Sequence, residues 1–167
     1  PRLTHRERAL VTIAAIAPDV DGLGAIAELT TRNDAHPLLW YTDYHHVLAH
    51  NLPFAIAFSF ATLLITRSKL TATLAFVAVH LHLAGDLIGS RGPDGYQWPI
   101  PYLYLFRGQP QLTWSGQWQL NAWPNVAISL ALLACTFVLA WRRGYSIVGL
   151  ISRRADAAFI AALRARF

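Results

Sequence analysis

The chain has 167 residues, a length that fits one domain, and its formal net charge is +5. Apolar residues make up 54% of it and charged residues only 14%, a balance unusual for a soluble globular domain. No basic stretch carries interleaved base-stacking aromatics, so nucleic-acid binding is disfavoured, and the single cysteine, Cys135, excludes a disulfide framework.

The first apolar segment covers residues 9–17 and follows three arginines. Extended back to Thr4 it would rise by only about 20 Å, which is too short to cross a bilayer. We therefore expect a short N-terminal helix. A secretory signal over residues 1–17 is the alternative, because basic residues precede the segment and small residues end it.

Two carboxylates follow in the sequence PDVD, which covers residues 18–21. Asp19 and Asp21 stand close to Gly22 and Gly24, so they could form only a turn. They are also candidate metal ligands, and a carboxylate left unligated could act as a general base.

The sequence YHHVLAH covers residues 44–50 and introduces His45, His46 and His50. The apolar run 52–66 that follows reaches the length of a span only if its helix begins near His45 or His46. His46 and His50 would share one face of such a helix, with His45 about 140° away. If His45 and His50 both bind metal, a loop or kink must lie between them.

Two longer apolar runs predict transmembrane helices over residues 70–89 and 122–141. Asp86 is the one charged residue in the first run, and the second run has none. Between them, residues 91–121 are rich in aromatics and prolines, which argues against one continuous helix. We expect an interfacial loop there, resting on headgroups or covering a site.

The sequence thus predicts an all-α membrane protein, a small bundle of about four helices in a single domain of residues 1–167. The short N-terminal helix joins three spans over 46–66, 70–89 and 122–141. In this topology one side carries 11 of the 14 basic residues and the other side seven of the nine acidic residues. The positive-inside rule places the basic side in the cytoplasm and the aromatic loop outside.

His82 and Asp86 form the most informative pair, because residues at i and i+4 lie on one face of a helix. Ionisable groups in lipid are costly and usually line a cavity or a site, although a proton relay or a packing pair is an alternative. His80 points to another face, and we interpret it as structural.

Several histidines and carboxylates from three segments converge on the outer half of the predicted bundle. Their mixture of imidazole and carboxylate suits a divalent metal. The candidate ligands are His50, His82, Asp86, Asp19 and Asp21, together with His45 or His46.

Four short motifs stand in a fixed order: PDVD at 18–21, HHVLAHN at 45–51, HLAGD at 82–86, and Gly95 followed by Trp98-Pro99. In these motifs the chain resembles the bacterial inner-membrane metal-dependent hydrolases, a family related to zinc-dependent phospholipase C domains. The family pattern is an early His, PD-x-D, H-R-G-x-T-H-S and H-x-x-x-D. The family's H-R-G-x-T-H-S element corresponds to HHVLAHN at 45–51, which keeps both histidines but lacks the Arg, Gly, Thr and Ser.

The resemblance covers residues 5–101 and implies metal-assisted hydrolysis, with zinc as the divalent metal and catalytic roles for Asp86, Asp19 and Asp21. It implies His5 as a further ligand, although the topology places His5 on the cytoplasmic side, and it favours His45 over His46. The aromatic outer loop suits a lipid-like or phosphoester substrate that enters from membrane lipid.

The competing interpretation is a non-enzymatic membrane protein in which these residues form a structural metal site or a metal or proton pathway. A transporter usually has more spans and repeats than this chain shows. A soluble all-α enzyme is disfavoured by the uncharged run 122–141. The sequence indicates neither the substrate nor the oligomeric state.

Overall fold

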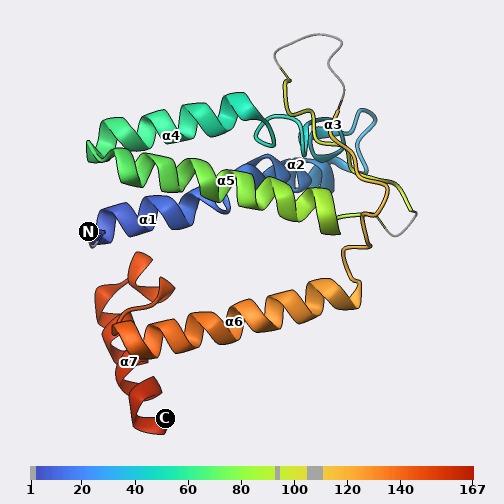
Figure 1. Cartoon of the computed structure of the whole chain (residues 1–167). Coiled ribbons are helices and arrows are strands. Elements are labelled where there is room, and N and C mark those ends of the chain that lie inside the picture. The colour runs from blue at the N-terminus through green and yellow to red at the C-terminus, as the bar shows by residue number, and fades with distance from the viewer. Residues whose placement is uncertain (1–2, 93–94, 105–110) are drawn as a thin grey trace. The chain divides into compact units, whose positions relative to one another are not determined.

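A computed structural model describes residues 3–92, 95–104 and 111–167 (Figure 1). These residues form helices, two short 3-10 turns (η) and two isolated bridges, without an extended strand. The chain divides into two compact units, Pro1–Leu120 and Asn121–Phe167. The elements are α1 (His5–Ala14), η1 (Ala17–Leu23), α2 (Gly24–Thr31), α3 (Trp40–Tyr44), α4 (Leu52–Thr66), α5 (Lys69–Gly89), α6 (Trp123–Arg143), η2 (Ile147–Leu150) and α7 (Arg153–Arg166).

The predicted small helical membrane bundle is confirmed. Helices α5 and α6 have 21 residues each and are long and apolar enough to cross a membrane. Helix α1 and the segment Ala17–Thr31 together pass the same test but are bent by 55°, as in a broken span or a re-entrant loop. Helix α4 is apolar but has only 15 residues, about 22 Å of rise.

Helix α1 runs parallel to α5 in the first unit. Thr4 caps α1 in a capping box with Glu7, and the Glu7 carboxylate also accepts a hydrogen bond from Thr71 at the start of α5. At the other end, the His82 ring contacts the carbonyl of Ala15. Since the tight turn at Arg67 reverses the chain between α4 and α5, α4 lies antiparallel to both (Figure 1).

Helix α4 begins at Leu52, whereas a full-length span would have to begin near His45 or His46. Asn51 is its N-cap: the side-chain oxygen accepts from the Phe54 amide, and the side-chain nitrogen donates to the carbonyl oxygens of Val47 and Leu48. His46 has a positive φ of 64°, which is incompatible with a continuing helix. The histidines therefore sit in a loop that precedes α4.

Small side chains allow the three helices of the first unit to approach closely. Ala14, Ala55 and Ala75 are completely buried where α1, α4 and α5 meet, and Val79 lies beside them. His80 contacts the Phe76 carbonyl and the Tyr102 hydroxyl, each at 2.8 Å. The interpretation of His80 as a structural residue agrees with these contacts.

The described part of the aromatic loop packs against the end of α5 and is not one continuous helix, as predicted. The Gln117 side chain donates to the Asp86 carbonyl, and the Trp118 amide donates to the Ile88 carbonyl. Residues 93–94 and 105–110 of this loop lie outside the described residues.

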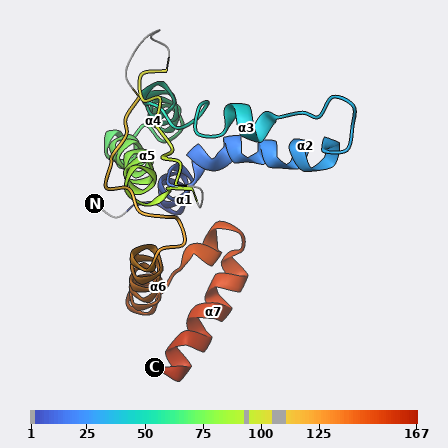
Figure 2. The ribbon, with the colours of Figure 1, turned by 90° about the vertical axis from the view of Figure 1, so that its right-hand side faces the viewer.

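The turn η1 and helices α2 and α3 form an arm that extends sideways from the bundle. Figure 2 shows α4 and α5 nearly end-on, with the arm running across the direction of their axes. The Glu28 carboxylate of α2 accepts hydrogen bonds from the backbone amide and the hydroxyl of Thr42 and so joins α2 to α3. The arm thus lies at a steep angle to α4 and α5.

The second unit consists of α6, η2 and α7. Gly144, with a φ of 76°, ends α6, and the side chain of Arg164 donates two hydrogen bonds to the Trp141 carbonyl. The buried Asp156 accepts hydrogen bonds from the amide and the hydroxyl of Ser146. These contacts hold α7 across the C-terminal end of α6.

Candidate metal centre

Three segments of the first unit bring histidines and carboxylates to one place. The turn η1 supplies Asp19 and Asp21, because α1 stops at Ala14 and the chain turns around Pro18. The loop before α4 supplies three histidines, and the last turns of α5 supply His82 and Asp86. The predicted convergence of these segments is therefore found in the structure.

His50, His82 and Asp86 form a compact triangle. The Nε2 atoms of the two histidines are 3.3 Å apart, and Asp86 Oδ2 is 3.4 Å from His50 Nε2 and 3.2 Å from His82 Nε2. Asp19 Oδ1 approaches the same nitrogens, at 3.3 Å from His82 and 3.8 Å from His50. His50 is fully buried, whereas the Asp19 side chain is 58% exposed, so Asp19 forms the solvent side of the group.

Hydrogen bonds on the far side of each ring determine which nitrogen carries the proton. His82 Nδ1 is 2.9 Å from the Ala15 carbonyl oxygen, which can only accept, so Nδ1 is the protonated atom. His50 Nδ1 is 3.3 Å from Asp21 Oδ2, a carboxylate oxygen that likewise accepts. When either ring is neutral, its Nε2 lone pair therefore faces the triangle.

The atoms at the centre of the group lack ordinary partners. Asp86 Oδ2 is buried without a hydrogen bond of acceptable geometry, although two histidine nitrogens lie within 3.4 Å of it. Two imidazole lone pairs and two carboxylate oxygens would repel one another at these distances. A buried set of acceptors is stable only when a cation or a proton lies among them.

The pKa of His50 also indicates that the group favours a positive charge. Burial would lower the pKa of His50, but its contacts with the carboxylates of Asp21 and Asp86 outweigh burial and raise the pKa to about 9. The surroundings of this ring thus favour a positive charge. Such a preference suits a metal ion as well as a proton.

Asp21 lies behind the histidines rather than among the converging atoms. Its Oδ1 is 2.8 Å from His45 Nδ1, its Oδ2 is 3.3 Å from His50 Nδ1, and Oδ2 also accepts from the Ala49 amide at 3.2 Å. A carboxylate in this place orients a metal-binding imidazole and increases its basicity. The geometry thus gives Asp21 a positioning role, distinct from that of Asp19.

His46 lies nearer the group than its neighbour His45. Its ring stacks on His50 with centroids 4.2 Å apart, and its Nδ1 is buried without a hydrogen-bond partner. Burial lowers the pKa of His46 to about 3, so its ring is neutral and a lone pair is available at neutral pH. One nitrogen each of His46 and His50 and an oxygen of Asp86 make a second possible ligand set, so the site extends from the triangle toward His46.

The donor atoms fit a small divalent ion. Nitrogen and oxygen ligands bound tetrahedrally at about 2.0–2.1 Å lie about 3.3–3.4 Å from one another. The distances within the triangle, 3.2–3.4 Å, match this spacing. Asp19, His50 and His82 also form a set able to hold an ion.

His5 and His45 are not brought into the converging group. His5 begins α1, and the group lies beyond the other end of that helix, about 15 Å of rise away. His45 pairs through Nδ1 with Asp21 and stacks on Tyr41. Between the two adjacent histidines, the geometry favours His46 over His45 as the residue nearest the group, whereas the resemblance favoured His45.

Two contributors to the site were not anticipated from the sequence. The Ala15 carbonyl acts through its backbone, and only the predicted end of the first helix would have indicated it. The Trp98 ring packs edge-on against His45 and His46, with centroid distances of 5.4 and 4.4 Å. Trp98 was noted as part of a motif, but its distance from the histidines depends on the fold of the loop.

Comparison with known families identifies the membrane context. Residues 2–152 match the model of the YdjM inner membrane protein family. The chain belongs to this family. The family description agrees with the predicted inner-membrane location and with the apolar helices α5 and α6. No curated protein and no solved structure matches the chain significantly.

Proposed function

We propose that this member of the YdjM family is a membrane-bound, metal-dependent hydrolase that cleaves an ester, most simply a phosphoester, of a lipid or other amphiphile. One observation carries the proposal. The Nε2 lone pairs of His50 and His82 and the carboxylates of Asp86 and Asp19 converge at ligand-like distances. A divalent metal such as zinc would bind these lone pairs and compensate the negative charge of the two carboxylates.

His50, His82 and Asp86 would hold the ion from the buried side. Asp21 and the Ala15 carbonyl keep both imidazoles in the tautomer that presents Nε2. Such an ion would supply a Lewis acid for a phosphoryl or carbonyl oxygen and would lower the pKa of a water molecule to roughly 7.

Asp19 would serve as the general base on the solvent side of the site. Its side chain is exposed and lies 3.3 Å from His82, so it can reach both a water molecule and the group. In hydrolysis of a phosphoester, the water oxygen bonds to phosphorus and the ester P–O bond breaks. The water proton passes to the Asp19 carboxylate and then to the leaving alkoxide.

The arm that carries Asp19 supports a lipid-like substrate. Its apolar side chains recur every three or four residues and are each more than half exposed. They are Ile16, Val20, Leu23, Ile26 and Leu29. Because the arm runs across the axes of α4 and α5, this stripe would lie in the plane of the interface beside the site (Figure 2).

The second candidate function is a structural metal site, and the closeness of Asp19 to the triangle favours it. If Asp19 binds the ion together with the triangle, four protein groups fill a tetrahedral sphere. Such closed spheres are typical of structural zinc, whereas a catalytic site keeps one position for water. A metal or proton pathway would use the same residues.

The first prediction concerns metal content. Protein purified in detergent should contain a divalent metal, measured by elemental analysis, and the His82→Ala and Asp86→Ala variants should lose it because each removes a donor of the triangle. His80→Ala is the matched control on the same helix and should retain metal. Full occupancy in the His82→Ala, Asp86→Ala double variant would exclude this pair from the site.

Asp21→Asn extends the same measurement to the positioning role of Asp21. The substitution keeps the size of the side chain but weakens its hold on His50, so metal affinity should fall by about 10–100-fold. An affinity equal to that of the unaltered protein would show that Asp21 does not orient the ligand.

The second prediction concerns turnover. A panel of phospholipids and generic phosphodiesters should give chelator-sensitive hydrolysis, and Asp19→Asn should retain metal but lose about 10²–10⁴-fold in rate, as expected for a general base. The exposed Asp34→Asn variant is the control for removing an acid from the same arm. No turnover on any substrate, together with loss of metal in Asp19→Asn, would favour the structural site.

The third prediction concerns orientation. In a Cys135→Ser background, an impermeant thiol reagent should label Ser115→Cys in intact spheroplasts and Ala161→Cys only after lysis, because the basic residues favour a cytoplasmic tail. The reverse labelling pattern would place the metal centre on the cytoplasmic side.

A further inference from the structure

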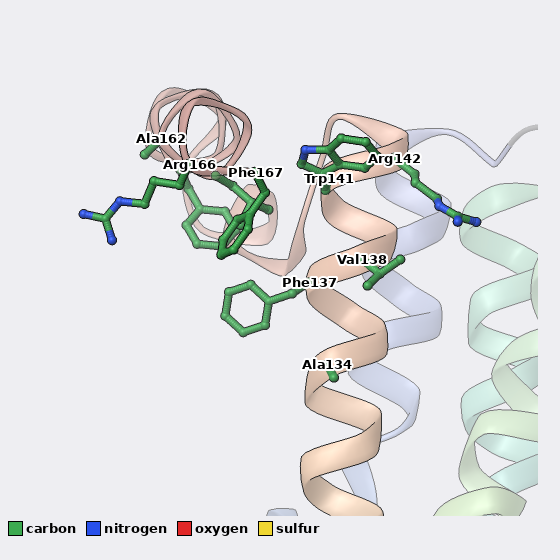
Figure 3. Close-up of a pocket in the computed structure, with 10 residues that line it drawn as sticks. Ala134, Phe137, Val138, Trp141, Arg142, Ala162, Arg166 and Phe167 are labelled. Carbon is green, nitrogen blue, oxygen red and sulfur yellow. The ribbon is translucent and has the colours of Figure 1, made fainter.

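A cavity lies far along the chain from the metal centre, in the unit formed by α6 and α7. It has a volume of about 910 Å³ and is walled by Phe137 and Val138 of α6, by Phe159 and Leu163 of α7, and by Phe167, which follows α7. Figure 3 shows Phe137 reaching out from α6 on the side where Phe167 lies. A cavity of this size lined by aromatic and aliphatic groups suits an apolar ligand.

Two arginines stand at the edges of this apolar cleft. Arg142 and Arg166 contribute to its lining, and Figure 3 shows their guanidinium ends directed outward on opposite sides. Both side chains are exposed. A ligand in the cleft would therefore meet an apolar wall, and the two positive charges lie outside it on opposite sides.

The second unit as a whole carries an unbalanced positive charge. Residues 121–167 contain six arginines and one acidic side chain, Asp156, so their formal side-chain charge is +5. Asp156 is buried and bonded to Ser146, so it neutralises no arginine at the surface. The charge of the unit thus favours an anionic ligand.

The place of the cleft at the end of a predicted span favours a membrane lipid as the anionic ligand. Helix α6 is long and apolar enough to cross a bilayer, and the cleft lies at its C-terminal end, beside Trp141. Figure 2 shows α6 end-on with α7 running across it, an orientation that keeps α7 close to the membrane surface. The two hydrogen bonds from Arg164 to the Trp141 carbonyl hold α7 at this place.

We propose that the cleft between α6 and α7 binds an anionic phospholipid of the leaflet reached by the C-terminal end of α6. The acyl chain lies along the wall formed by Phe137 and Phe159, whose ring centroids are 6.0 Å apart, and the phosphate lies outside the cleft on the side of Arg166. Charge complementarity and the membrane depth of the cleft both favour a bilayer lipid over a soluble phosphate. This binding site is independent of the proposed hydrolase activity.

The test uses full-length protein in detergent and two fluorescent lipids with identical acyl chains, phosphatidylglycerol and phosphatidylcholine. Fluorescence anisotropy should show phosphatidylglycerol binding about fivefold or more tighter. The double variant Arg142→Gln, Arg166→Gln should lose this preference. The matched control Arg6→Gln, Arg32→Gln removes two charges from the first unit and should retain it.

A second variant separates the apolar part of the cleft from the charge. Ala134→Trp fills the space beside Phe137 and should weaken both lipids to a similar extent, with an unchanged circular dichroism spectrum. Excess glycerol 3-phosphate should not displace the lipid, because it lacks an acyl chain. Equal binding of the two lipids by the unaltered protein, displacement by glycerol 3-phosphate, or unaltered binding by Ala134→Trp would overturn the proposal.

Discussion

The candidate site depends on the hydrogen bonds made by the Nδ1 atoms of His50 and His82. Each ring gives its Nδ1 proton to an oxygen outside the group, to Asp21 in one case and to the Ala15 carbonyl in the other. Both Nε2 lone pairs then face the carboxylates of Asp86 and Asp19. Without these two bonds either ring could present a proton instead, and the convergence of acceptors that indicates a metal would not exist.

The length of α1 explains why one of these bonds is possible. Helix α1 stops at Ala14, and the carbonyls in the last turn of a helix have no partner within it. The Ala15 carbonyl is therefore free to accept from His82, and the turn that follows directs Asp19 and Asp21 toward the histidines. A first helix long enough to cross the membrane would carry these groups away from α5. The break in the first apolar segment is thus part of the site.

The parts of this fold that follow from local pattern were predicted from the sequence, and those that depend on loop conformation were not. Long apolar runs indicated α5 and α6, and the i, i+4 spacing placed His82 and Asp86 on one face. Which of His45 and His46 lies nearer the group could not be predicted, because the left-handed backbone at His46 and the stacking of its ring on His50 are not evident from spacing. Likewise, the sequence could not separate the positioning contacts of Asp21 from the exposed place of Asp19, because two carboxylates two residues apart look equivalent until a fold buries one.

X-ray absorption at the zinc edge tests the central claim most directly, because it reports which ligands surround the ion. The account predicts nitrogen and oxygen ligands at about 2.0–2.1 Å, with outer-shell scattering from two imidazole rings. Because His82→Ala should lose its metal on purification, this variant is measured after loading with excess zinc, and its scattering should fall to one ring. A spectrum without imidazole scattering, or one unchanged in His82→Ala, would contradict the assignment of His50 and His82 as ligands.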